Sequence, residues 1–109
     1  MTYIKINDTL YPAAITGRLS DPNWGGRSSK TIRLEMAAST ATELFINDVH
    51  WSIVEDYIDA EEHVQQIEYD NSEYCIAGDI TDHRNGAVSV KMGKATDKEI
   101  IDIMMGGAV

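Results

Sequence analysis

Residues 3–19 read YIKINDTLYPAAITGRL, and this stretch decides the fold class. Asn7 and Asp8 tolerate the left-handed backbone of tight turns, so the segments on either side of them are expected to pair as a β-hairpin. Pro12 cannot donate a hydrogen bond to a neighbouring strand, which places the second strand near a sheet edge or at a bulge. That strand alternates with a period of two, and its inward face is expected to consist of Tyr11, Ala13, Ile15, Gly17 and Leu19.

The tripeptide Ile6-Asn7-Asp8 recurs at Ile46-Asn47-Asp48, again between an apolar stretch and an extended stretch that contains aromatic residues. This repetition predicts a second hairpin turn, which leads from residues 44–46 into a strand over residues 49–57 with Trp51 on its buried face. A repeat of three residues also arises by chance, so internal duplication and coincidence both remain open.

Four further strands are predicted from alternating apolar residues. The strand over residues 64–70 is expected to have both faces partly exposed to solvent. Asn85-Gly86 is the pair favoured in a type I′ hairpin turn, so the last two strands should be antiparallel neighbours. The four predicted strands cover residues 31–36, 64–70, 74–82 and 87–91.

Two short helices are predicted from a change of period. Thr40 with Glu43 forms a possible capping box for a helix over residues 38–45, and a second capping box opens a helix over residues 97–105. A chain of 109 residues has room for one core. The sequence therefore predicts a single α+β domain over residues 1–109, mainly an antiparallel curved sheet or small open barrel with two short helices.

The formal net charge of −9 is unevenly distributed along the chain. Residues 1–47 contain five Lys or Arg and four Asp or Glu, whereas residues 48–109 contain four and fourteen. Nucleic-acid binding requires a clustered basic surface, so no nucleic-acid partner is expected. The gradient either serves solubility alone or allows the mildly basic part of one copy to bind the acidic part of the next.

No stretch approaches the roughly 18 apolar residues of a membrane span, and the N-terminus lacks the pattern of an export signal. We therefore expect no membrane association and a location in the cytoplasm. Cys75 is the only cysteine. It suits a reducing compartment, and a small core residue is a better interpretation of it than a nucleophile.

Motifs for catalysis or cofactor binding are missing from the sequence, including a nucleophile elbow, a phosphate-binding loop and a dinucleotide fingerprint. The nearest approach to a metal-ligand cluster is Asp79, Asp82 and His83, whose spacing matches no established metal motif. Hydrated loop tips commonly carry such residues. We therefore expect no enzyme activity, no cofactor and no metal, and keep a small hydrolase or metal-dependent enzyme built on these three residues as an alternative.

Residues 20–30 are rich in Pro, Gly, Asn and Ser and form the strongest loop signal in the chain. Trp24 stands at the centre of this loop. It either folds back onto the core or projects as an anchor for a partner. Because a rigid aromatic side chain beside cations is typical of interface anchors, the predicted partner-contact residues are Trp24, Arg27 and Lys30.

Five stretches of the chain carry a resemblance to a group of known proteins. They are residues 6–13, 21–24, 31–36, 45–54 and 79–94. Together they resemble small uncharacterised proteins of bacteriophages and prophages in Gram-positive bacteria, of the kind encoded among tail genes. The resemblance contains no catalytic motif, so it transfers no active-site residue. It implies a role in the virion or in its assembly.

These observations lead to one expectation and one alternative. We expect a non-enzymatic, tail-associated structural or assembly protein of a phage or prophage, located in the host cytoplasm or the virion. It would act through protein–protein contacts with itself or with other tail proteins. The alternative is a monomeric acidic binding module or regulator that engages a basic protein partner, which predicts salt-sensitive one-to-one binding without self-assembly.

Overall fold

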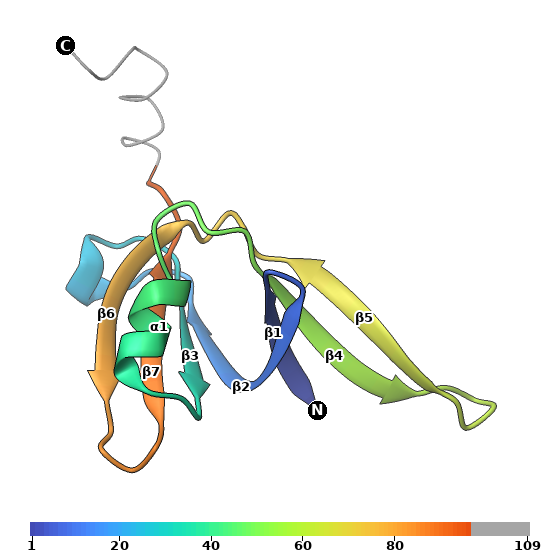
Figure 1. Ribbon diagram of the computed structural model, residues 1–109. Coiled ribbons are helices and arrows are strands. Elements are labelled where there is room, and N and C mark those ends of the chain that lie inside the picture. Colours follow the sequence, from blue (N-terminus) through green and yellow to red (C-terminus); the bar gives the residue numbers. More distant parts are fainter. Residues whose placement is uncertain (97–109) are drawn as a thin grey trace.

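The computed structural model describes residues 1–96 of the chain. Within them, seven antiparallel strands form one open sheet in the order β5-β4-β1-β2-β3-β7-β6 (Figure 1). The strands are β1 (Thr2–Ile6), β2 (Thr9–Arg18), β3 (Ser29–Leu34), β4 (Ser52–Ile58), β5 (Val64–Asp70), β6 (Ile76–Asp82) and β7 (Val88–Gly93). The predicted antiparallel sheet is confirmed.

The described residues contain one α-helix, α1 (Ala38–Leu44), and one short 3₁₀ helix, η1 (Pro22–Trp24). The helix predicted over residues 38–45 is therefore confirmed, whereas the helix predicted over residues 97–105 lies outside the described residues. The predicted capping box of α1 is wrong, because the helix begins one turn earlier, after Ala37, and has no side-chain cap. No helix among residues 1–96 is long and apolar enough to cross a membrane.

Strand β2 joins the two halves of the sheet. Its first residues pair with β1, from Thr9 to Pro12, and its later residues pair with β3, from Ala13 to Arg18. Pro12 thus lies where β2 exchanges one neighbour for the other, and Figure 1 shows β2 bending through this region. The prediction that this strand lies near a sheet edge is wrong, because β2 is the central strand of the seven. Pro12 directly precedes the ladder with β3, which starts at Ala13.

The first predicted hairpin is confirmed and the second is wrong. Asn7 and Asp8 both have positive φ, 53° and 62°, and Ile6 lies opposite Thr9. Asn47 and Asp48 instead connect α1 to β4 and close no hairpin. The Asn47 side chain accepts a hydrogen bond from the Ala77 amide, and the Asp48 amide donates to the Cys75 carbonyl, so this turn is fixed by β6 rather than by a partner strand of its own.

The hairpin between β6 and β7 is confirmed, but its predicted turn type is wrong. A type I′ turn at Asn85-Gly86 requires positive φ at both residues. Positive φ occurs at Arg84 and Gly86 instead, and the His83 amide donates to the Ala87 carbonyl across a longer loop. The Asp82 carboxylate binds the Arg84 amide and stabilises that loop.

The core lies between α1 and one face of the sheet, and it extends from β7 and β3 to Ile4 and Ile6 of β1. Ile32, Val90 and Met92 are fully buried there, and Trp51 closes the core from the segment that leads into β4. The predicted inward residues Tyr11, Ala13 and Ile15 of β2 pack against this core, as do other partly buried side chains. Leu19 was predicted to face inward, but it lies beyond the end of β2 and is 92% exposed.

Candidate protein-contact surface

The hairpin of β4 and β5, residues 52–70, projects from the body of the sheet and is called the arm below (Figure 1). Every residue of β5 is exposed, and β5 is an edge strand with β4 as its one neighbour among the described strands. Of the apolar residues of the arm, Ile53 packs against the core and Val54 is 3% exposed, and both lie near the base of the arm. The core therefore leaves most of the arm in solvent.

Large apolar side chains occur on both faces of the arm. Ile58 lies opposite Val64 near the tip, and these side chains are 70% and 69% exposed. The alternation of side chains along a strand places Tyr57, Ile67 and Tyr69 on the other face. Exposed apolar groups beside an unpaired strand edge are typical of surfaces that bind other proteins.

The tip of the arm is an ordered loop built on Asp59. Its Oδ1 accepts hydrogen bonds from the amides of Glu61 and His63, both at 2.9 Å, and its Oδ2 accepts one from Gln65. The bond from the His63 amide, with those from Gln65 and the Glu61 amide, lowers the pKa of Asp59 against the opposing effect of burial. An ordered tip loses little conformational entropy when it binds a partner.

The arm is strongly acidic. It contains seven Asp or Glu and no Lys or Arg. Glu68 forms an ion pair of 3.1 Å with Lys5 of β1, and the Asp59 and Glu61 carboxylates lie within 4 Å of His63. The acidic residues are Glu55, Asp56, Asp59, Glu61, Glu62, Glu68 and Asp70.

A polar hollow of about 410 Å³ lies at the base of the arm and includes Lys5, His50 and Asp70. Asp70 Oδ1 accepts hydrogen bonds from the amide and the hydroxyl of Ser72, at 2.9 and 2.6 Å. These bonds, with the nearby His50, lower the pKa of Asp70. The carboxylate is thus used to fix the turn between β5 and β6, and the hollow is best explained as part of that turn.

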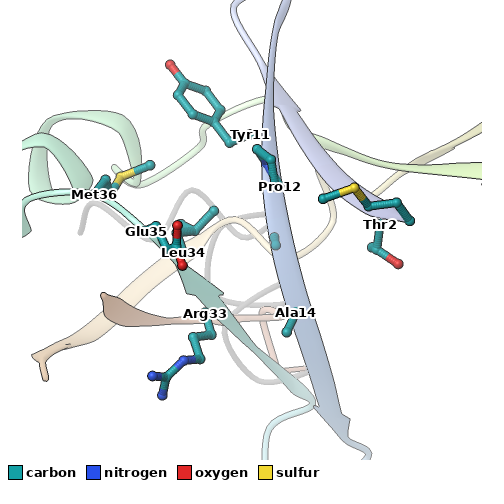
Figure 2. A pocket seen from close by; sticks show the side chains of 10 residues that line it. Thr2, Tyr11, Pro12, Ala14, Arg33, Leu34, Glu35 and Met36 are labelled. Carbon is teal, nitrogen blue, oxygen red and sulfur yellow. The ribbon is translucent and has the colours of Figure 1, made fainter. Parts of the chain in front are cut away.

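A second hollow, called the groove below, lies where β2 exchanges β1 for β3. Figure 2 shows the end of β3 and the residues that follow it on one side, and β2 on the other. The groove has a volume of about 610 Å³ and is mostly apolar. Its lining consists of Met1, Thr2, Tyr11, Pro12, Ala13, Ala14, Arg33, Leu34, Glu35 and Met36.

The structure brings two of the three predicted contact residues together. The Trp24 ring lies on the backbone of β6 and β7, so close that an added Cβ would be 2.6 Å from it at Gly78 and 2.7 Å from it at Gly93. Arg27 lies over the ring at 4.9 Å and Lys91 at 5.7 Å. This geometry corresponds to the alternative in which Trp24 folds back onto the sheet.

Asp21 holds the Trp24 loop in place. Its carboxylate is fully buried, pairs with Lys91 at 2.5 Å, and accepts hydrogen bonds from the Asn23 amide and the Ser29 hydroxyl. The bond to Lys91, followed by those to Asn23 and Ser29, lowers the pKa of Asp21 despite its burial. The loop is therefore a fixed part of the body.

Lys30, the third predicted contact residue, lies on the opposite face of β3 from Ser29, which binds the Trp24 loop. Its ammonium group donates to the Asn71 side chain and lies 4.7 Å from the centre of the Tyr74 ring. Burial lowers the pKa of Lys30, and the nearby Glu73 acts in the opposite direction. Lys30 thus ties β3 to the turn before β6 and is separate from Trp24 and Arg27.

Asp79, Asp82 and His83 do not form a metal site. Among residues 1–96, no group of three or more His, Cys, Asp or Glu side chains is arranged to hold a metal ion. Asp82 binds the Arg84 amide, and His83 Nε2 lies 2.7 Å from the Ser89 hydroxyl. Both side chains therefore stabilise the hairpin between β6 and β7.

The arm and the groove were not identified as contact surfaces from the sequence. The signal for the arm was present, because residues 64–70 alternate without an apolar face. The groove had no such signal, since its lining comes from three separate stretches. No protein-family model, curated protein or solved structure matches the chain.

Proposed function

We propose that this protein is a non-enzymatic structural or assembly protein and that its arm is the surface that binds other protein subunits. The observation that carries the proposal is the exposure of β5 along its whole length, together with large apolar side chains on both faces of the arm. A chain that exposes such a strand in solution risks nonspecific pairing. A protein partner that covers the strand would remove that risk.

The resemblance to small phage and prophage proteins encoded among tail genes gives the proposal its setting. In that setting the protein is a tail-associated component whose partners are copies of itself or other tail proteins. A small body that projects an ordered arm is suited to such assemblies, because the arm can contact a neighbour while the body keeps its own core. No catalytic step is needed for this role.

The test compares an arm variant with a matched control. Replacing Tyr57, Ile67 and Tyr69 by Ser removes the apolar side chains from one face of the arm, whereas Ile46→Ser removes a 54% exposed side chain elsewhere. We expect the wild-type protein and the control to form oligomers at high concentration and the arm variant to be monomeric. Light scattering after size exclusion measures the mass, and thermal melting verifies that each variant is folded.

A second candidate function is a monomeric acidic module that engages a basic protein. The seven acidic residues of the arm, with no Lys or Arg among them, favour it. It predicts a monomer at every protein and salt concentration, which would contradict the assembly proposal. Equal oligomer masses for the wild-type protein and the arm variant would show that the arm is not the contact surface.

A further inference from the structure

We propose that β5 pairs with β5 of a second copy as an antiparallel neighbour, so that two sheets join across a two-fold axis at Ile67. This inference rests on the proposed function and names both the partner, a second copy of this chain, and the contact, the free edge of the arm. In an antiparallel pair of identical strands each strand offers the same edge to the other. The contact is therefore isologous and closes as a dimer.

The sheet has two edges among the described strands, β6 and β5, and they differ in how they are protected. Strand β6 has a register shift between Ala77 and Ile80, and the turn at residues 47–48 binds the Ala77 amide and the Cys75 carbonyl. Strand β5 pairs with β4 without a register shift and contains neither Lys nor Pro. Because natural edge strands avoid pairing through bulges, Lys, Pro or a covering segment, β5 is the open edge.

The backbone groups of alternate β5 residues point away from β4. The Asn71 amide donates to the Trp51 carbonyl at one end of the arm, and the Asp59 amide donates to the His63 carbonyl at the other. Both pairs continue the register of β4 and β5, in which hydrogen-bonded and non-hydrogen-bonded pairs alternate. The odd-numbered residues of β5 therefore bond to β4. The even-numbered residues, 64, 66, 68 and 70, direct their amide and carbonyl groups to the open edge.

One register pairs all of these groups between two copies. An axis at Ile67 sets Gln66 opposite Glu68 of the second copy, and it also sets Val64 opposite Asp70. Each such pair can exchange two hydrogen bonds. An axis at Glu68 would instead set this carboxylate opposite its own counterpart, which is destabilising. An axis at Gln66 would leave Asp70 beyond the end of the partner strand.

The apolar side chains of β5 suit the same register. Ile67 would lie opposite Ile67 of the second copy in a non-hydrogen-bonded pair, whose Cα atoms are about 4.5 Å apart. Tyr69 lies on the same face of the strand and would be diagonal to Ile67 of the other copy, within reach of an aromatic side chain. These side chains are 41% and 52% exposed in the single chain. Pairing would bury part of that surface, which favours association.

The charge of the arm opposes pairing and makes it dependent on salt. Each arm contains seven Asp or Glu and no Lys or Arg. The two acidic residues of β5 are engaged within their own copy, since Glu68 forms its ion pair with Lys5 and Asp70 accepts hydrogen bonds from Ser72. Salt screens the repulsion between the two arms, so the dimer should become stronger as the salt concentration rises. A basic partner would show the opposite dependence.

The first test removes one amide from the open edge. Gln66→Pro deletes an amide that points away from β4, so the ladder with β4 keeps its hydrogen bonds. The dimer loses two hydrogen bonds by symmetry, and we expect its association to weaken by roughly tenfold or more. Gln66→Ala is the matched control, because it also loses the side-chain bond to Asp56 but keeps the amide. Light scattering after size exclusion measures association, and circular dichroism verifies folding.

The second test determines the register with cysteines in a Cys75→Ser background, which lacks the single native cysteine. Ile67→Cys is expected to form an intermolecular disulfide with oxidised glutathione, because the two residues face each other at a Cα separation that a disulfide spans. Tyr69→Cys is the control, since its two copies would lie roughly 13 Å apart. A mixture of Gln65→Cys and Tyr69→Cys should cross-link, because these residues lie opposite each other. Non-reducing gel electrophoresis detects each product.

Four outcomes would overturn the inference. Gln66→Pro associates like Gln66→Ala, Ile67→Cys cross-links no better than Tyr69→Cys, or rising salt dissolves the dimer. In these three cases, if the variant with Ser at Tyr57, Ile67 and Tyr69 is monomeric and the wild-type protein is not, the proposed function stands and the arm binds in another way. In the fourth, the wild-type protein is monomeric under all conditions, which contradicts the inference and the proposed function together.

Discussion

Strands β7 and β5 contain similar numbers of large apolar residues, yet one is core and the other is surface. Val88, Val90 and Met92 of β7 are at most 1% exposed, whereas Val64, Ile67 and Tyr69 of β5 are at least 41% exposed. Helix α1 packs across β6 and β7, and none of the described elements packs across β5. A strand thus becomes core because another element covers it, and its own hydrophobicity is not sufficient.

The largest expected effect is on the free energy of unfolding, which a substitution in the body should lower far more than a substitution in the arm. Trp51 is 1% exposed and its indole nitrogen donates to the Tyr74 carbonyl, so Trp51→Ala leaves a cavity and an unpaired carbonyl. We expect Trp51→Ala to lower the free energy of unfolding by about 3–5 kcal/mol and Tyr69→Ala on the arm to change it by less than about 0.5 kcal/mol. Urea denaturation measures both values, and a comparable loss for Tyr69→Ala would show that the arm is part of the cooperative core.

A smaller effect is expected where the Trp24 loop meets the sheet. A Cβ at Gly93 would lie 2.7 Å from the Trp24 ring and from the Arg27 side chain, so Gly93→Ala is expected to destabilise the fold by about 1–3 kcal/mol. Gly17→Ala is the control, because its Cβ would meet nothing closer than 3.8 Å.

The same substitution in a Trp24→Ala background distinguishes a folded-back tryptophan from a partner anchor. If the ring rests on β7, Gly93→Ala lowers the free energy of unfolding by less in that background, because the clash with the ring is gone. Urea denaturation measures the loss in free energy of unfolding in both backgrounds. Equal losses would show that the ring does not rest on β7 and would support Trp24 as a free anchor.

The smallest change in stability is expected at acidic pH. It concerns one carboxylate of the body and one carboxylate of the arm. Asp21 in the body and Asp59 in the arm both have a pKa below the ordinary 3.8. A carboxyl group with a lowered folded-state pKa contributes stability above 3.8, and this contribution is lost as the pH falls below 3.8 and through the folded-state pKa.

Asp21→Asn should therefore lower the urea midpoint at neutral pH and reduce its further decrease as the pH falls below 3.8, relative to the wild-type protein. Asp59→Asn should leave the midpoint unchanged and accelerate hydrogen exchange at the Glu61 and His63 amides, because its bonds are confined to the tip. A wild-type acid dependence in Asp21→Asn would contradict the role assigned to its bond with Lys91.

Local signals in the sequence were reliable where neighbouring residues decide the conformation. Asn7-Asp8 closes a hairpin because both residues adopt positive φ and the flanking strands are adjacent in the chain. The same dipeptide at Asn47-Asp48 closes no hairpin, because α1 ends at Leu44 shortly before it and the turn is held by hydrogen bonds to Cys75 and Ala77. The type I′ prediction at Asn85-Gly86 failed for a related reason, because the loop is longer than two residues and bends at Arg84.

The sequence by itself determined the antiparallel strands, the short helix predicted over residues 38–45 and the buried alternation of β3 and β7, because these depend on spacing within single segments. Only the tertiary structure decided which strands α1 covers, where Trp24 rests and that residues of β2 and β3 enclose a groove. Those features depend on contacts between segments far apart in the chain. The separation of a covered body from an exposed, acidic arm is such a contact-dependent property.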